Sequence, residues 1–487
     1  MTLLGFLGIL IGLGLLIAFA FRGWSVLLLA PVAALIAALF SREPLLAHWT
    51  QTFMLSAASF LAQFFPLFLL GGLFGKLMED SGSVAAVASF MTQQLGPQRA
   101  MLAVVLAGAL VTYGGVSLFV AFFVLAPMAQ EMFRVAGIPR RLMPAAIVLG
   151  TSTFTMSALP GTPSIQNAIP MPFFGTTPFA APGLGIMASL IMLAFGLWWL
   201  NREEAIAKRN GESFGDGAPM PAEHLATDEK LRERTTSARE FDPAEIMHGA
   251  ATDVPPPAML AALPLITVIV VNLAMSLFIL PALDTRFLAE APWGETSLAA
   301  VGGVWAVITA LACAIVTVLA VNFRRLPALR ATMDAGANAA VLPAMSVASL
   351  VGFGAVVAAM PAFTVVRDAV LNVGGGPLVS LAVATNVLAA LTGSASGGLT
   401  IALDALGATY MTRAAEIGLN PELLHRVAVI GSGTLDSLPH NGAVVTLLAV
   451  CGSTHRDSYR DIVVVGIIGA LVALAAVIAL GSLVGSF

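Results

Sequence analysis

Apolar runs long enough to form membrane-crossing helices recur along this chain and limit what it can fold into. About 20 helical residues cross roughly 30 Å of hydrocarbon. Eight such runs lie at about 3–21, 24–40, 53–75, 184–200, 259–282, 298–321, 338–360 and 462–485. Only 10% of the 487 residues are charged, against roughly 25% in an ordinary soluble domain. We therefore predict an all-α polytopic membrane protein in a lipid bilayer, with the first run retained as a helix and not removed as a signal peptide.

One polar stretch separates two hydrophobic halves. Residues 201–256 are charged and contain Pro and Gly, as in EKLRERTTSAREFD, a composition typical of a solvated connector. It divides the chain into units 1–200 and 257–487. Cys313 and Cys451 lie in or beside apolar runs, which favours core thiols over disulfide or metal chemistry. The net charge of -4 gives no indication of nucleic acid. We expect no metal, cofactor or nucleic-acid partner.

Matching segments indicate that one structural unit is used twice. AGIPRRLMPAAIVLG at 136–150 matches IGLNPELLHRVAVIG at 417–431, with two glycine pairs each 281 residues apart. YGGVSLFVAF likewise matches SGGLTIAL, and SALPGTP matches DSLPHNG, each with a two-residue shift. Internal repeats fix an architecture that hydropathy alone leaves open.

Charge predicts opposite orientations for the two units. In the second half, the net acidic loop from Asp284 to Glu295 precedes a basic loop, which the positive-inside rule places in the cytoplasm. That basic loop contains Arg324, Arg325 and Arg330. The basic residues of the first half all lie on the cytoplasmic side if residues 100–134 enter and leave the membrane on one side. They are Arg22, Lys76, Arg134, Arg140 and Arg141. The units then form an inverted repeat around a cytoplasmic connector, a common plan of secondary transporters.

Each unit contains a Gly-rich turn inside an apolar run: VTYGGVS in the first and LTGSASGGLT in the second. Gly allows a tight reversal, and Ser or Thr can bind freed backbone groups. We predict re-entrant helical hairpins at about 100–134 and 380–413. Close packing of two ordinary helices through small residues is the alternative.

Each unit also contains an interrupted helix, at about 142–175 and 423–450. The interruptions are GTSTFTMSALPGTPSIQN and GSGTLDSLPHNG. Proline removes an amide donor and clashes with the preceding turn, so the helix must open there. Opened backbone at mid-membrane depth is tolerated where it is buried in protein or lines a polar cavity. Two hairpin tips and two broken helices should therefore converge on one central site.

The polar and glycine residues of these four segments are candidate substrate ligands. No Lys or Arg lies within the four quoted stretches, the two Gly-rich turns and the two helix interruptions. We therefore expect an anionic substrate to be held by helix ends and neutral donors. So many hydroxyls suit a hydroxylated carboxylate, whereas a bare metal ion would need more carboxylates. The candidates are Gly114, Gly115, Ser117, Ser152, Thr153, Ser157, Gly161, Thr162, Gln166, Asn167, Ser394, Ser396, Gly397, Gly398, Thr400, Ser432, Thr434, Ser437 and Asn441.

Three ionisable residues near these segments are candidates for proton coupling: Asp436, His440 and Asp404. A charge at the bilayer centre costs about 2.5 to 3.5 kcal/mol on insertion scales, so such residues usually mark an ion or proton path. Alternatively, Asp436 caps a half-helix, His440 binds a nearby carbonyl, and Asp404 faces a scaffold partner or solvent.

Two other functions are open to such a chain. Asp436, Ser437 and His440 include the residue types of a hydrolase triad, but three side chains within five residues are poorly placed to orient one another. We therefore expect no catalytic residues and no enzyme activity. Duplicated hairpins also build passive anion channels. A channel equilibrates its substrate, whereas a symporter concentrates it.

Three long stretches resemble the gluconate permease family, the gluconate:proton symporters of the ion-transporter superfamily. These stretches are GGVSLFV, FTMSALPGTPSIQNAIPMPFFGTTPFAAP and LPHNGAVVTLLAVCGSTHRDSYRDI. The resemblance implies proton-coupled uptake of gluconate-like sugar acids, short hydroxy acids such as 3-hydroxybutyrate, or another small carboxylate, across a bacterial inner membrane. It also implies a scaffold domain that forms a homodimer and a transport domain that moves as an elevator.

Overall fold

The computed structural model describes residues 2–20, 24–116, 118–214, 249, 252, 254–392, 394–439 and 441–487. Within these ranges the chain forms helices and turns and contains no β-strand. The prediction of an all-helical protein is therefore confirmed. Six described helices are long and apolar enough to cross a bilayer. The number is seven if the helices Ser83–Leu95 and Pro97–Tyr113, which meet at a bend of 103°, are counted as one span.

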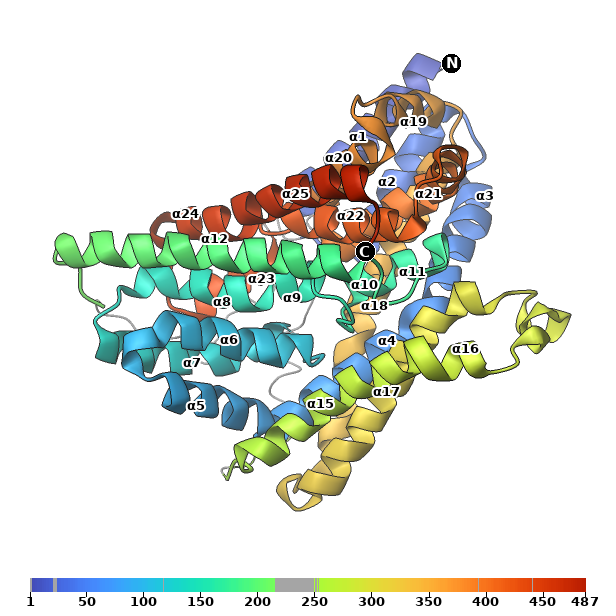
Figure 1. Cartoon of the computed structure of the whole chain (residues 1–487). Coiled ribbons are helices and arrows are strands. Elements are labelled where there is room, and N and C mark those ends of the chain that lie inside the picture. The colour runs from blue at the N-terminus through green and yellow to red at the C-terminus, as the bar shows by residue number, and fades with distance from the viewer. Residues whose placement is uncertain are drawn as a thin grey trace.

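The helices pack as two groups (Figure 1). One group runs diagonally through the right and lower parts of the view, and the other lies across its left side. The long-helix group contains α1 (Thr2–Ala20), α2 (Val26–Ser41), α4 (Met54–Asp80), α15 (Ala258–Ala274), α17 (Leu298–Asn322) and α18 (Leu329–Ala359). Two of the eight predicted spans, in α1 and α2, are apolar but shorter than a full crossing.

The second, broken-helix group contains the segments that the sequence analysis singled out. It comprises α6 (Ala100–Tyr113), α7 (Leu118–Ala136), α8 (Met143–Thr151), α9 (Phe154–Ser157), α10 (Ile165–Ala168), α11 (Pro170–Phe174), α12 (Pro182–Arg209), α20 (Gly376–Thr392), α21 (Ala395–Ile417), α22 (Pro421–Thr434), α23 (Gly442–Val450), α24 (His455–Ile462) and α25 (Gly469–Val484). Two lateral helices, α5 (Ser83–Leu95) and α19 (Phe363–Leu371), lie in the chain between the groups, while the short α3 (Leu45–Ala47) precedes α4 and α16 (Leu280–Ala282) follows α15.

Helices α6 and α7 pack together as one hairpin, and α20 and α21 as another. The opened segments separate α8 and α9 from α10, and α22 from α23. Gly161 has a φ of +78° in the first opening, a conformation that residues with a Cβ rarely adopt. Pro160 and Pro163 flank it. Local sequence therefore explains where the helices open.

The two ends of the connector are fixed to the helices beside it. Helix α12 continues nine residues into the predicted connector, to Arg209, and Glu212 then accepts a hydrogen bond from Arg141, 3.0 Å away. At the other end, the Thr252 amide donates to the Asp80 carbonyl at 2.9 Å. Thr332 of α18 donates to the Asp80 carboxylate at 2.6 Å. The turn between α17 and α18 thus lies at the connector end of α4.

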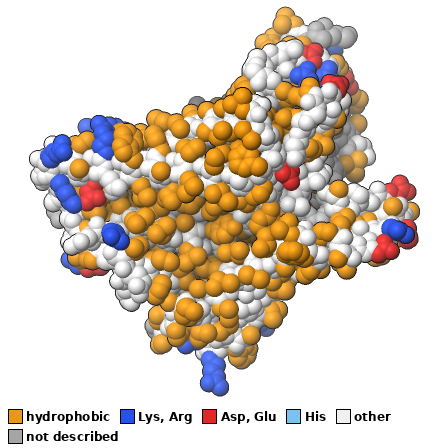
Figure 2. All heavy atoms as spheres, in the orientation of Figure 1, with side chains coloured by type: hydrophobic (Ala, Val, Ile, Leu, Met, Phe, Trp, Pro, Cys, Tyr) orange, Lys and Arg blue, Asp and Glu red, His pale blue; other side chains and the backbone are white. Residues whose placement is uncertain are grey.

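Figure 2 shows hydrophobic side chains over most of the visible face, with Lys and Arg at its left edge and lower tip. By comparison with Figure 1, these are the ends of α12 and α24 and the turn between α17 and α18. The turn contains Arg324 and Arg325, and the last turn of α12 contains Lys208 and Arg209. These basic residues lie at the ends of the molecule from which the connector leaves, and others lie at the upper and right edges of the view.

Helices α4 and α18 approach so closely that glycine is required where they cross. A Cβ at Gly72 would lie 2.5 Å from the carbonyl oxygen of Gly336, and one at Gly336 would lie 2.9 Å from the Cα of Leu73. A Cβ at the neighbouring Gly71 would meet no heavy atom within 4 Å. The crossing therefore depends on Gly72 and not on Gly71.

We expect Gly72→Ala to separate α4 from α18 and to destabilise the protein by about 1–3 kcal/mol, the usual cost of overpacking. Gly71→Ala, one residue away, should be neutral or slightly stabilising because Ala favours helix over Gly. The midpoints of thermal unfolding in detergent test this. Equal midpoints for the two variants would contradict the described crossing.

Candidate functional site

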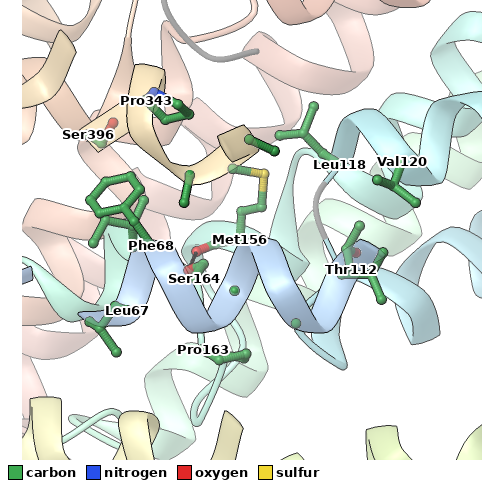
Figure 3. Close-up of a pocket in the computed structure, with 18 of the residues that line it drawn as sticks. Leu67, Phe68, Thr112, Leu118, Val120, Met156, Pro163, Ser164, Pro343 and Ser396 are labelled. Carbon is green, nitrogen blue, oxygen red and sulfur yellow. Dashed lines mark hydrogen bonds between the residues drawn. The ribbon is translucent and has the colours of Figure 1, made fainter. Parts of the chain in front are cut away.

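A cavity of about 250 Å³ lies between the two groups of helices. Its walls come from α4 and α18 on one side and from three of the four interrupted segments on the other. In Figure 3, Met156 and Ser164 of the first broken helix lie between Phe68 of α4 and Thr112 of the first hairpin. Ser394 and Ser396 of the second hairpin tip complete the wall. Most of the lining is apolar.

Four predicted substrate ligands line this cavity: Gly115, Gln166, Ser394 and Ser396. Four further lining residues, which lie within or beside the same interrupted segments, were not among the predicted ligands: Thr112, Met156, Pro163 and Ser164. No lining residue of α4 or α18 was among them either. Those two helices carry no interruption that marks them as part of a site, although the small residues Gly71, Gly72, Gly75, Ala335, Ala339 and Ala340 form their cavity faces.

The cavity wall also contains a basic side chain, contrary to the expectation drawn from the four segments alone. Lys76 and Glu79 of α4 both line it. The Lys76 Nζ lies 3.2 Å from Glu79 Oε2 and 3.0 Å from Asp80 Oδ1. Lys76 is only 7% exposed. Its charge is thus offset by two carboxylates of its own helix, at the connector end of the cavity.

Asp436 connects the second broken helix to the second hairpin tip. Its Oδ1 accepts a hydrogen bond from the Ala395 amide at 2.8 Å and another from the Asn441 Nδ2 at 3.0 Å. Ala395 is the first residue of α21, and the side chain of the preceding Ser394 accepts from the Gly397 amide at 3.2 Å. The carboxylate therefore occupies the amino-terminal end of a helix, where negative charge is favoured. The fourth interrupted segment reaches the cavity indirectly, through the tip that it holds.

Buried polar side chains hold the opened backbone of the first broken helix. Arg426 of α22 is fully buried, and its guanidinium donates to the carbonyls of Ala158, at 3.1 Å, and Ala180, at 2.5 and 3.1 Å. The Tyr113 hydroxyl donates to the Pro160 carbonyl at 2.7 Å, and the Asn272 amide donates to the Gly161 carbonyl at 2.9 Å. These carbonyls would otherwise be unpaired in an apolar environment, which is costly.

Asn167 belongs to the same supporting network. Its Nδ2 donates to the carbonyls of Thr162 and Pro178, both at 3.0 Å. Its Oδ1 lies 3.1 Å from the His425 Nε2, and Thr176 lies 2.6 Å from the His425 Nδ1. The side chain that we predicted to bind substrate is instead used to hold the opened segment. No sequence signal singled out Arg426 or His425, because both lie within an ordinary helical run.

Most of the other predicted ligands do not line the cavity. Thr153, Ser157, Thr400, Ser432 and Thr434 each donate to a carbonyl three or four residues earlier, at 2.7 to 3.0 Å. Hydroxyls in helices commonly bind their own backbone in this way. The remaining predicted ligands that lie away from the cavity wall are Gly114, Ser152, Gly161, Thr162, Gly397, Gly398, Ser437 and Asn441.

Two of the three coupling candidates can be compared. Asp436 is half-buried in the tip described above, whereas Asp404 is exposed on α21. His440 and the predicted ligand Ser117 lie outside the described residues, as does Arg22. The thiols of Cys313 and Cys451 are free. Within the ranges described, no three His, Cys, Asp or Glu side chains come together as a metal site.

Comparison with known proteins places this arrangement among transporters. A model of the GntP family permeases matches residues 3–172. An uncharacterized transporter of Bacillus subtilis (strain 168), YxjC, is 41% identical over 488 residues, which cover 98% of each chain. The YdaH transporter of Alcanivorax borkumensis has a TM-score of 0.50 and 16% identity, over 89% of this chain and 87% of that chain.

A second solved structure is MtrF of Neisseria gonorrhoeae, described within a class of antimetabolite efflux pumps. It has a TM-score of 0.52 and 16% identity, over 90% of this chain and 83% of that chain. At this identity, the two solved structures show a likeness of fold alone.

We expect Arg426→Met to lower stability by about 1–3 kcal/mol for each carbonyl left without a donor. Methionine keeps the apolar stem but cannot donate to Ala158 or Ala180. Arg330→Met is the control, because that side chain is 97% exposed. Thermal unfolding in detergent distinguishes the two. An unchanged midpoint for Arg426→Met would show that the opened segment does not need this side chain.

Proposed function

We propose, on the premise that this chain belongs to the GntP family of permeases, that it imports a small hydroxylated monocarboxylate together with protons. Its family and its apolar spans identify it as a multi-pass secondary transporter. The observation that carries the proposal is the cavity where both hairpin tips meet the first broken helix. We propose the bacterial inner membrane as its location.

The size and lining of the cavity support a small hydroxylated substrate. A volume of about 250 Å³ lies near the lower end of the roughly 300–1,000 Å³ range of small-molecule pockets. Hydroxyls of Ser394 and Ser396 and the amide of Gln166 offer a few polar contacts in a mainly apolar wall, as in typical small-molecule sites. A gluconate-like sugar acid or a short hydroxy acid such as 3-hydroxybutyrate fits this description. Because Lys76 is already paired with two carboxylates, helix ends remain the proposed anion ligands.

The arrangement of the two groups supports an elevator movement. All four interrupted segments belong to the broken-helix group, so a rigid movement of that group would carry the tips along with the substrate. The surface that it would move along includes Gly71, Gly75, Ala335 and Ala339 of α4 and α18. Larger side chains, among them Phe68 and Val347, line the same surface beside these small residues. The long-helix group is the proposed scaffold.

The order of elements supports the proposed inverted repeat. Each half has a long helix, a lateral helix, a hairpin and an interrupted helix in the same order: α4, α5, α6–α7 and α8–α10, then α18, α19, α20–α21 and α22–α23. We further propose that two copies form a homodimer through the scaffold, as the family resemblance implies. Large exposed apolar side chains such as Leu46, Leu55 and Phe278 would then face lipid or the second copy.

Proton coupling is proposed to pass through Asp436. This carboxylate is half-buried, lies at the hairpin tip that lines the cavity, and forms no ion pair with any described residue. A charge withdrawn from water without a counter-charge is costly, and protonation removes it. His440 remains a proposed partner from its place in the sequence, and Asp404 is the next candidate because it lies on the same hairpin.

A passive anion channel is the main alternative, and accumulation separates it from a symporter. In proteoliposomes with an acidic exterior, we expect labelled gluconate or 3-hydroxybutyrate to rise inside above the external concentration and to leak out when an ionophore collapses the pH gradient. Labelled succinate and labelled ethanolamine serve as dicarboxylate and amine controls. Equilibration without accumulation would favour the channel, and preference for a control compound would overturn the substrate class.

The proposed topology predicts that Arg330 and Asp284 lie on opposite faces, since α17 separates their loops. Single cysteines at these positions, in a protein without Cys313 and Cys451, should react with a membrane-impermeant maleimide from opposite sides. A cysteine at Arg22 should share the cytoplasmic side with Arg330. If the cysteines at positions 22 and 330 react from opposite sides of the membrane, the proposed inverted repeat is rejected.

A further inference from the structure

The amino-terminal end of α21 combines two features that are rarely found together. It borders the cavity through Ser394 and Ser396, and its first amide already holds the carboxylate of Asp436 at 2.8 Å. The unpaired amides of a helix amino terminus favour an anion. A substrate carboxylate that approached this end from the cavity would meet a negative charge already in place.

A second side chain in the same cavity points to a ligand. Gln166 is only 6% exposed and lines the wall. Among the described residues its amide has no hydrogen-bond partner. The cavity therefore contains a polar group that a bound substrate would satisfy, in the same wall as the end of α21.

Among the described residues, no basic side chain forms an ion pair with Asp436. From α24, the His455 Nε2 lies 2.8 Å from the Pro439 carbonyl, and the Tyr459 hydroxyl donates to the Ser437 carbonyl at 3.2 Å. Neither of these side chains binds the carboxylate itself. Helix α20 has no charged residue.

The other charged residues on the elements packed around this tip are occupied elsewhere or exposed. On α22, His425 and Arg426 bind the first broken helix, as described above. Asp404 of α21 is exposed. On α7, Glu131 and Arg134 pair with each other at 2.7 Å. His440 lies outside the described residues.

We propose that Asp436 and the carboxylate of the substrate compete for the amino-terminal end of α21, so that the anion binds beside Ser394 and Ser396 only after Asp436 has taken up a proton. This inference rests on the proposed function and specifies its coupling step. Two carboxylates close together in a low-dielectric site do not both stay ionised. The empty carrier then has a charged Asp436, and the loaded carrier has a neutral Asp436 beside the charged substrate. One negative charge is present at the tip in both forms.

Competition of this kind has a quantitative signature. If one proton must bind before the anion, the dissociation constant of the substrate rises about tenfold per pH unit on the alkaline side, since each tenfold fall in proton activity lowers the competent fraction tenfold. Asp436→Asn is isosteric with the protonated acid. Its affinity should equal that of the wild type at acidic pH and should vary less than about twofold with pH.

Equilibrium binding of labelled gluconate and labelled 3-hydroxybutyrate to the full-length protein in detergent, from pH 5 to 9, tests the proposal. Asp284→Asn is the matched control, because that carboxylate lies in an exposed loop, and it should keep the wild-type slope. A folded Asp436→Asn protein that keeps the slope, or that binds at no pH, would overturn the competition.

A second variant decides the matter if Asp436→Asn does not fold. Asn441→Ser removes the amide that donates to the charged carboxylate, so protonation becomes easier and the pH profile should move to higher pH with its slope unchanged. An unmoved profile contradicts the proposal. If the wild-type protein binds and accumulates a probe while the variants behave like Asp284→Asn, the competition is rejected and the proposed function stands. If the wild-type protein binds neither probe, both the proposed substrate class and the competition are rejected.

Discussion

The need to pair every backbone polar group in an apolar environment underlies this structure. Opening a helix inside a membrane protein leaves carbonyls and amides without partners, and no water is available in hydrocarbon to replace them. Here the partners come from distant side chains: Tyr113, Asn272 and Arg426 bind the carbonyls of the first opening. The hairpins, the broken helices and the cavity between them can exist because these few side chains are in place.

The two openings are held by charges of opposite sign. A guanidinium fills the carbonyl-rich side of the first opening, and the carboxylate of Asp436 fills the amide-rich end of the second hairpin. The matching segments of the repeat place Ser157 where the second unit has Asp436. Arg426 carries a charge that does not change in the physiological pH range, whereas a carboxylate can exchange a proton.

Local patterns predicted the all-helical fold. Apolar runs identify spans because the bilayer demands them, and the openings fall at Pro160, Gly161 and Pro163, where the chain cannot continue a helix. The lengths of α1 and α2 and the end of α12 were less predictable. Helix α12 continues past its apolar run because Glu203 there pairs with Arg141 and Arg202, and such partners are invisible in a local stretch of sequence.

The sequence by itself determined that the chain is helical and lies in a membrane, since apolar runs of spanning length recur along it. Only the tertiary structure decided which side chains reach the cavity. The hydroxyls of Thr153 and Thr400 bind their own helices, while Lys76 and Glu79 enter the wall from α4. A hydroxyl can satisfy itself locally, and a helix with no interruption can turn any face towards a partner. The rotation and packing of helices, which depend on contacts between distant segments, therefore selected the residues of the site.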